Sequence, residues 1–487
     1  MSDRVIIKDT VIAGNVDSTT SDNIVLVVGC SFGGDAELKT PTLCTSLSEF
    51  ADAFGNTTDT KDVKEEDLTP AEDANHLSYI TLTDLPVTGT LVIKATIGAQ
   101  PIELVDNANG CVVGSISSGA QTNLVVGRIK NKVVTILTGE TLDAVSEVTY
   151  KTLISVTDEC LLGYQYAVSM LTNGFPVLYD SIFDCTAGGT IPSTVDYIKE
   201  LRDVVMTLGD DRVNYDFKFI PTMYDILTYS GDTYSTVQSE INYINEIIAK
   251  VTELGDRLVI IDINGKSSND IEETIDKALA VSNSYCTCFG NYGKYSSELM
   301  PGSFWYLVRL SDNVTNHGLP IYHPVANQTG YVNMVDPVIN YTYMEMMTVG
   351  QVQEGKGFNP IGKISRNDGY TIFGNLTCLR DKTHINNPYN LLHARLLTIE
   401  VKRLLRRIGL VNLFATNAAD VIRQYDILLR NTLSGMRAAG YIDSFEINFT
   451  AEGTQVKGTV EITINGTVES ITASVIATLN TSVVVAD

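Results

Sequence analysis

The feature that most restricts the fold of this chain is a regular alternation of helical and strand patterns between residues 159 and 330. The apolar runs of strand length in this region lie at 175–179, 215–220 and 258–263. The helical patterns before them lie at 161–171, 192–208 and 236–254, and another is expected to begin at residue 270. Repeated helix–strand units of this length are typical of a doubly wound, mainly parallel sheet. The apolar run 24–29 is expected to join that sheet as its opening strand.

The flanking regions differ in character and predict further domains. Residues 87–158 carry short β-branched runs separated by Gly and Asn, which predicts a small all-β insertion. Helical patterns at 389–408 and 418–439, followed by alternating strand runs, predict an α+β region. The expected division is an N-terminal arm (1–20), an α/β domain (21–86 and 159–330), an all-β insertion (87–158), a C-terminal α+β assembly domain (331–476) and a C-terminal arm (477–487). The predicted fold class is therefore α/β plus β, in a multidomain chain with extended terminal arms.

The distribution of charge restricts the partners of the chain. A net charge of −24 argues against the broad phosphate contacts that nucleic-acid binding requires. The acid-rich run 59–73 lacks the D-x-D-x-D-G spacing of a calcium loop, so it is expected to be a solvated loop. Residues 391–440 are the exception to the acidic composition, because eight Lys and Arg occur there with three acids, an excess of five positive charges.

Part of this positive charge forms a stripe on the helix expected at 389–408. At 100° per residue, Arg395, Lys402 and Arg406 fall within about 40° of one another. Arg403 and Arg407 flank them. The apolar residues of the helix occupy a separate arc and are expected to pack on the domain core: Ala394, Leu397, Val401, Leu404, Leu405 and Ile408. Taken alone, such a stripe is an ordinary solvated helix face.

Two catalytic motifs overlap at the end of the opening strand, and neither fits its context. Residues 29–33 (GCSFG) match the G-x-S-x-G pattern that exposes a hydrolase serine, here Ser31. That serine should precede a long helix, but Pro41 ends any helix begun at residue 33 within two turns. A phosphate-binding loop needs Lys and Ser or Thr where the chain has Asp35 and Ala36. The glycines are therefore assigned to a sharp turn after the strand.

The other chemistry-bearing residues form no metal or cofactor pattern. The eight cysteines are scattered, and Cys286-Thr287-Cys288 is not the C-x-x-C of zinc or redox sites, so free and mostly buried thiols are expected. The five histidines show no metal-binding spacing. Neither a metal nor a cofactor is expected. Asp262, at a strand end, is the best isolated candidate for an enzymatic carboxylate, although a structural role is commoner at such a position.

Two further observations concern where the chain acts. No apolar run approaches the length of a membrane span. The N-terminus has acids where a signal peptide has a basic start and an apolar stretch. The chain is therefore expected to stay in the cytoplasm in which it is made.

Several segments, in their order along the chain, resemble the sheath proteins of contractile phage tails and related phage-derived injection machines. The run 24–29, the glycines at 33–34, Pro41 and the Phe-Gly at 54–55 are similar to the opening of sheath chains. "LTNGFPVLYD" and "DRLVIIDI" resemble the family's Asn-Gly turn and its Arg-led strand. "GFNPIGKISRNDGYTIFGNLTCLRD" resembles its "gIN…G…wGnRT" segment, with Phe373 for the usual Trp and Leu376 for the usual Arg. "VNLFATNAADVIRQYDILLRNTLSGMRAAGYI" resembles the stretch with an Asn-capped helix and a late glycine. The resemblance covers most of the chain except the β insertion.

This resemblance implies a structural function without catalysis. Sheath subunits form stacked rings around a rigid tube in an extended, high-energy state, and their contraction drives the tube through a cell envelope to deliver a genome or effector. The implied partners are other copies of the chain, a tail tube protein, and baseplate and tail terminator proteins, with no nucleic acid and no membrane insertion. The implied location is a virion tail assembled in the host bacterial cytoplasm. The alternatives are an α/β enzyme of unknown substrate and a capsid-like shell protein that does not contract.

The resemblance also implies two interfaces. Sheath families hold their tube through a helix of the C-terminal domain, which predicts a tube-facing stripe formed by Arg395, Lys402, Arg403, Arg406 and Arg407. Both terminal arms have strand-forming runs but no local sheet, so each is expected to add a strand to a sheet of a neighbouring subunit. The residues of these runs are Val5, Ile6 and Ile7 in the N-terminal arm and Val483, Val484 and Val485 in the C-terminal arm.

Overall fold

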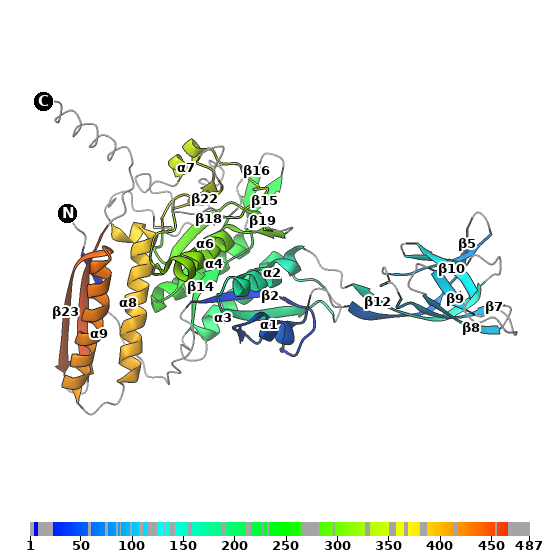
Figure 1. The fold of residues 1–487 in the computed structure, drawn as a ribbon, viewed down its shortest axis with the longest axis horizontal. Helices are drawn as coiled ribbons and strands as arrows, with labels where there is room; N and C mark the ends of the chain where they lie inside the picture. Colours follow the sequence, from blue (N-terminus) through cyan, green and yellow to red (C-terminus); the bar gives the residue numbers. More distant parts are fainter. Residues whose placement is uncertain are drawn as a thin grey trace.

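A computed structural model describes the chain over residues 4–7 and 23–465. Within this span the description omits residues 57–59, 74–75, 84–85, 88, 98–99, 107–110, 115–123, 131, 137–141, 154–157, 187–189, 210–215, 226, 231–232, 264–281, 296–297, 327–331, 350–356, 365–368, 380–386, 413–416 and 453–454. Figure 1 shows a central body, a β module that stands apart at one end, and a C-terminal part at the other. Each of the three has its own cluster of buried apolar side chains.

The central body (23–56 and 158–379) is built on one mixed sheet. Its strands are β2 (Ile24–Ser31), β3 (Thr42–Cys44), β13 (Val177–Asp184), β14 (Phe217–Pro221), β17 (Leu258–Asp262), β18 (Cys286–Gly290), β21 (Asn359–Gly362) and β22 (Thr371–Ile372). They lie in the order β22-β21-β18-β17-β14-β2-β13-β3. All neighbours pair in parallel except β3 and β22, which are antiparallel edge strands. The predicted mainly parallel sheet is confirmed, and β2 lies inside it between β13 and β14.

Helices and two small hairpins complete the central body. The helices are α1 (Leu47–Phe54), α2 (Asp158–Thr172), α3 (Thr194–Leu208), α4 (Gln238–Leu254), α6 (Gly302–His317) and α7 (Tyr343–Val349). The short 3-10 helix η2 (Pro388–Asn390) belongs to the C-terminal part, which it opens. The hairpins are β15 (Leu227–Ser230) with β16 (Thr233–Thr236), and β19 (Gly293–Tyr295) with β20 (Glu298–Met300). The helix α3 begins at a capping box, in which Ser193 and Asp196 satisfy each other's backbone N–H groups. The helix expected from residue 270 lies outside the described residues.

The β module (60–153) is a separate antiparallel sheet. Its strands are β4 (Thr60–Leu68), β5 (Ala71–Glu72), β6 (Ser78–Thr81), β7 (Val92–Ile97), β8 (Gln100–Asp106), β9 (Cys111–Gly114), β10 (Leu124–Lys130), β11 (Val133–Ile136) and β12 (Leu142–Leu153). They lie in the order β4-β12-β7-β8-β9-β10-β11-β6-β5. The module begins before the predicted boundary at residue 87, because β4, β5 and β6 belong to its sheet.

The prediction of a solvated loop at 59–73 is wrong, since most of this acid-rich run forms β4 and pairs with β12. The strand tolerates its charges because they have partners across the sheet. Lys64 Nζ lies 2.9 Å from a carboxylate oxygen of Glu147 on β12. Glu65 is half-buried and accepts a 2.9 Å hydrogen bond from the backbone N–H of Thr83. Local composition alone could not show these cross-strand partners.

The C-terminal part (387–465 with 4–7) combines long helices with a small sheet. Its elements are α8 (Leu392–Val411), α9 (Ala418–Ala438), β23 (Ile442–Glu452), β24 (Gln455–Ile464) and the N-terminal strand β1 (Arg4–Ile7). Asn417 caps α9, because its side chain accepts a hydrogen bond from the backbone N–H of Ala419 at 3.1 Å. The antiparallel sheet has the order β1-β24-β23.

Candidate functional site

Helix α8 lies between the central body and the rest of the C-terminal part, and it contributes to both hydrophobic cores (Figure 1). Toward the central sheet it buries Leu392, Leu396 and Ile399. Toward α9 and β24 it buries Ala394, Leu397, Val401, Leu405 and Ile408. A helix that is buried on two sides fixes the two parts to one another. Its charged side chains therefore need partners inside the protein.

Arg395 is held between two tyrosine rings. Its guanidinium carbon lies 3.9 Å from the ring centre of Tyr285 and 3.7 Å from that of Tyr389. The guanidinium also donates a hydrogen bond to the hydroxyl of Ser284. Burial lowers the pKa of Arg395, while the two tyrosines act in the opposite direction. Stacking on both faces of a guanidinium is a strong, desolvated cation–π arrangement.

The next turns of α8 form ion pairs with the central body. Arg406 pairs with Asp256, which follows α4, and also donates to the backbone carbonyl of Leu254 at 3.4 Å. Arg403 lies 2.6 Å from Asp216 and donates to the carbonyl of Asp256 at 3.2 Å. Arg406 and Asp256 are both almost fully buried, at 7% and 1% exposed. Such a pair resists separation because either charge left alone would be buried without its counter-ion.

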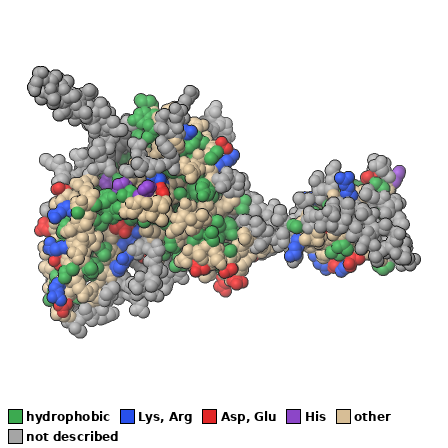
Figure 2. Space-filling model, in the orientation of Figure 1, with side chains coloured by type: hydrophobic (Ala, Val, Ile, Leu, Met, Phe, Trp, Pro, Cys, Tyr) green, Lys and Arg blue, Asp and Glu red, His purple; other side chains and the backbone are tan. Residues whose placement is uncertain are grey.

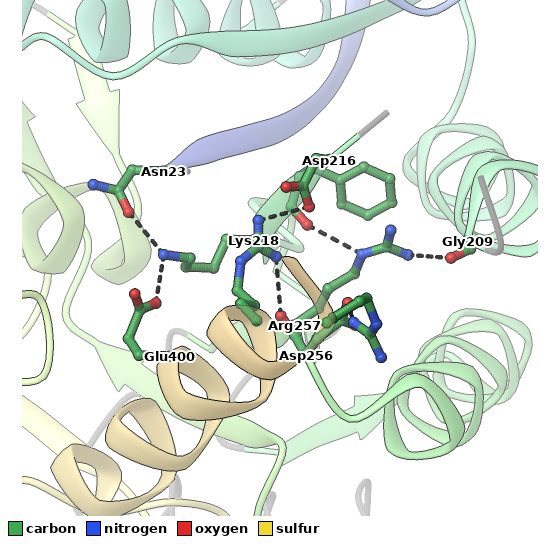
Figure 3. Close-up of polar contacts among 10 residues, drawn as sticks. Asn23, Gly209, Asp216, Lys218, Asp256, Arg257 and Glu400 are labelled. Carbon is green, nitrogen blue, oxygen red and sulfur yellow. Dashed lines mark hydrogen bonds and ion pairs between the residues drawn. The ribbon is translucent and has the colours of Figure 1, made fainter. Parts of the chain in front are cut away.

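Lys218 and Arg257 make further polar contacts beneath α8, as Figure 3 shows. Lys218, on β14, is 1% exposed, and its ammonium lies 2.5 Å from Glu400 of α8 and 2.9 Å from the side-chain oxygen of Asn23. Arg257 donates to the backbone carbonyls of Phe217 (3.1 Å) and Gly209 (2.8 Å). We call the set Asp216, Lys218, Asp256, Glu400, Arg403 and Arg406 the junction network. It joins α8 to the ends of β14 and α4.

The prediction that the basic stripe of α8 is exposed is therefore wrong for three of its five residues. Arg395, Arg403 and Arg406 are only 4–7% exposed. Lys402 is half-buried and donates to the hydroxyl of Tyr285 at 3.2 Å, whereas Arg407 is exposed. The reason is that the neighbouring acids come from elements more than a hundred residues away in sequence. Sequence reasoning missed those acids, although the Gly-Asp-Arg at 255–257 before β17 was a usable signal. Contact with a tube is not tested by a single chain.

Helix α9 presents an exposed face in the C-terminal part. Its buried side is formed by Val421, Tyr425, Leu429, Leu433 and Met436. Its outer side exposes Arg423, Arg430 and Arg437, which lie seven residues apart along one line of the helix, and Ile427 beside them is 50% exposed. Figure 2 shows basic side chains spaced along the end of the molecule where α9 and β23 lie. We call these four residues the α9 face.

The N-terminal strand pairs within its own chain. In β1, Val5, Ile6 and Ile7 lie opposite Ile462, Glu461 and Val460 of β24. The sheet that this arm joins is formed by elements more than 400 residues away in sequence, and its pairing with a neighbouring subunit stays a prediction. Among the described residues, the outer edge of β23 pairs with no further strand. Val483, Val484 and Val485 lie outside the described residues.

The carboxylate suggested as an enzymatic group, Asp262, is completely buried. It accepts hydrogen bonds from Ser303 N–H (2.6 Å), Ser303 Oγ (2.7 Å) and Met223 N–H (2.9 Å). Burial raises its pKa to about 7, and these hydrogen bonds act in the opposite direction. Asp262 therefore ties the end of β17 to the start of α6, without access for a substrate.

The raised pKa of Asp262 predicts a pH dependence of stability. The folded chain holds this proton up to about pH 7, whereas the unfolded chain releases it near 3.8. The contribution of Asp262 to stability is therefore fully present below pH 3.8 and is lost as the pH rises to 7, by about 4 kcal/mol at most. Asp262→Asn should remove this component. Denaturant unfolding of both proteins between pH 4.5 and 7.5 measures it, and equal slopes in the two proteins would contradict it.

The hydrolase motif has a structural explanation. Ser31 is the last residue of β2, and it is 3% exposed rather than raised on a turn. A side chain at Gly29 would lie 2.2 Å from the hydroxyl of Tyr179 and 3.1 Å from the Cα of Gly163 on α2. The glycine is required because a helix and a tyrosine both approach the strand closely.

Over the ranges that the structure describes, no group of three or more His, Cys, Asp or Glu is placed to hold a metal ion. None of the helices described there is both long and apolar enough to span a membrane.

Comparisons with known proteins add the following. No protein-family model and no curated protein matches the sequence. The chain is similar to one in the cryo-EM structure of the anti-feeding prophage (AFP) baseplate, with 10% identity, 96% of each chain covered and a TM-score of 0.51. It is also similar to a chain of the PVC sheath complex, an extracellular contractile injection system in its contracted state. The identity there is 15%, the similarity covers 63% of this chain and 78% of that chain, and the TM-score is 0.43.

At these identities the comparison establishes a shared fold. The fold is one found in phage-derived contractile injection machinery, which agrees with the resemblance in the sequence. The neighbour that carries this conclusion is the AFP chain, because the similarity extends over nearly the whole of both chains.

Proposed function

We propose that this chain is a sheath subunit of a contractile injection machine, which polymerises around a tube and contracts to drive the tube through a cell envelope. The observation that carries the proposal is the fold shared with the AFP baseplate chain over 96% of both, which supports a part in contractile machinery. The resemblance of the sequence to sheath proteins supports the sheath role within it. The junction network supports it, because a subunit that transmits force needs its parts fixed to one another. The proposed partners are further copies of the chain, a tube protein, and baseplate and terminator proteins. The proposed location is the tail of a particle assembled in a bacterial cytoplasm, a phage virion or a related injector.

In this proposal the terminal arms link neighbouring subunits. The β1–β24 ladder seen within one chain is the same ladder that β1 would form on a neighbour's β24. Sixteen residues, 8–23, lie between β1 and β2, and a chain of that length can span about 55 Å when extended. That reach permits exchange between adjacent copies, as in other strand-addition assemblies. The C-terminal arm is proposed to pair with the outer edge of β23 in another subunit.

The α9 face is the better candidate for tube contact than the α8 stripe. Arg395, Arg403 and Arg406 could meet a tube only if α8 left the central body, which would break the junction network. The α9 face combines exposed arginines with one exposed apolar side chain, Ile427. Arginine together with apolar contact is typical of interface residues. Each surface contact is weak, so a stacked array could grip the tube and still release it during contraction.

Charge reversal on the α9 face tests this assignment. Arg423→Glu/Arg430→Glu/Arg437→Glu should fold and form polymers, but particles with a tube should fall at least tenfold in number because each subunit loses its tube contacts. The matched control is Lys132→Glu/Lys151→Glu/Lys199→Glu, which changes the net charge equally at exposed positions on other elements. Particle counts by electron microscopy after co-expression with the tube protein give the measurement. Equal counts for the two variants would place the tube contact elsewhere.

Electron microscopy of the purified chain distinguishes the proposal from its alternatives. Helical tubes or stacked rings with a hollow centre are expected for a sheath. Closed shells would indicate a capsid-like protein, and small oligomers of uniform size would favour an enzyme. The burial of Asp262 and Ser31 argues against the enzyme, since neither group is open to a substrate.

A further inference from the structure

A pair of thiols outside the junction network lies close together in the central body. Cys286 is the first residue of β18, and Cys378 follows β22. Their sulfur atoms are 3.3 Å apart, although the residues are separated by 92 positions in sequence. Both side chains are 1% exposed. The sequence suggested no partner for Cys286, because only the folded chain brings the two segments together.

The backbones that carry these thiols are held at the spacing of neighbouring strands. The N–H of Cys378 donates to the carbonyl of Cys286 at 2.7 Å. Residues that are hydrogen-bonded across neighbouring antiparallel strands have Cα atoms about 5.5 Å apart, which is within the range that disulfides accept. The sulfurs need to approach to about 2.05 Å. Rotation of the two side chains can supply most of that change.

A buried polar network keeps the two segments in register. The side-chain amide of Asn359 donates to the carbonyl of Leu376 at 2.9 Å and to that of Cys288 at 3.0 Å. Its oxygen accepts the N–H of Leu376 at 2.8 Å, and the hydroxyl of Thr287 donates to the Leu376 carbonyl at 2.8 Å. The pair is therefore a fixed geometry and not a chance approach of two loops.

We propose that Cys286 and Cys378 are an oxidation site that closes to a disulfide when the chain meets a peroxide. One thiol loses its proton, the thiolate attacks a peroxide oxygen, and the O–O bond breaks. The leaving hydroxide takes up that proton, so a sulfenic acid and water form. The second sulfur attacks the sulfenic sulfur, the S–S bond forms, and the S–O bond breaks with release of water. Two thiols and one hydrogen peroxide thus give one disulfide and two waters. Hydrogen peroxide is proposed as the oxidant because it is small enough to reach a buried pair of thiols. Burial is expected to make the reaction slow.

The cross-link would stabilise the connection between the central sheet and helix α8. Residues next to Cys378 also pair with the start of that helix, since Thr377 N–H donates to the carbonyl of Asn390 and Leu392 N–H donates to that of Asn375, both at 2.9 Å. A disulfide here closes a loop of 92 residues, which restricts the unfolded chain. The inference rests on this geometry alone and is independent of the proposed function.

The test uses the full-length chain purified under reducing conditions, then treated with hydrogen peroxide, alkylated after unfolding and mapped by mass spectrometry. The expected product is a peptide pair linking Cys286 to Cys378 that disappears on reduction, with a melting temperature at least about 5 °C above that of the reduced chain. Cys378→Ala should lose both effects, and the matched control Cys288→Ala should keep them. Alkylation of both cysteines as free thiols after peroxide treatment would overturn the proposal, as would a link from Cys286 to Cys288. Peptide mapping of the wild-type chain alone shows whether Cys286 and Cys378 are linked. The test therefore holds even if a variant does not fold.

Discussion

Replacing Asp256 with alanine is expected to lower the free energy of unfolding by about 3–5 kcal/mol. The reason is that Arg406 would be left almost fully buried without the carboxylate that pairs with it. Asp256→Asn, which keeps the shape of the side chain, should also destabilise the chain, to a smaller extent. Equilibrium unfolding in denaturant, followed by far-UV circular dichroism, gives the measurement.

A matched control separates this burial effect from loss of charge in general. Asp426 forms a 2.8 Å ion pair with Arg430 on the surface of α9, with both side chains well exposed. Asp426→Ala is expected to leave the free energy of unfolding unchanged within error, because exposed pairs contribute little. An Asp256→Ala variant as stable as Asp426→Ala would show that the junction network does not hold α8 to the central body.

Deleting residues 1–12 is expected to abolish polymer formation while leaving a folded chain. The deletion removes β1, which is an edge strand of the three-stranded sheet, and leaves in place every described member of the hydrophobic core formed by α8, α9, β23 and β24. The backbone ladder of β1 with β24 is the link that the proposal assigns to neighbouring subunits. Sedimentation and electron microscopy measure the loss of polymers, and circular dichroism checks the fold.

The control for this deletion is a chain that lacks only residues 2–3 and keeps β1 intact. It should polymerise like the full chain. If the chain without residues 1–12 also forms normal polymers, β1 does not link subunits.

The central sheet could be predicted from sequence because its signals are local. The runs at 175–179, 215–220 and 258–263 match β13, β14 and β17 within a few residues, and each follows a helix where the pattern placed one. Apolar runs between helical periods leave few alternatives to a parallel sheet. The cap of α9 at Asn417 was recognisable for the same reason, since it depends on residues that are close in sequence.

The candidate site depends on contacts between segments that are distant in the sequence, and local sequence patterns could not predict these contacts. A helical projection placed the arginines of α8 on one face, but it could not show that Asp216 and Asp256 of the central body lie against that face. The same limit applies to β1, whose partner strand lies near the other end of the chain. The acids along β4 were also wrongly predicted to lie in a loop, because local composition does not show whether a residue has a partner on another strand.

Subunits linked by exchange of β1 should become covalently joined when a disulfide is introduced between β1 and β24. Ile6 and Glu461 lie opposite one another in the β1–β24 ladder, so cysteines at both positions are within reach of a disulfide. In assembled polymers of Ile6→Cys/Glu461→Cys, mild oxidation should give a ladder of covalently linked chains on a denaturing gel. Each single variant is a control and should give no ladder. Disulfides found only within each chain of an assembled polymer would show that β1 stays on its own β24, which would contradict the account.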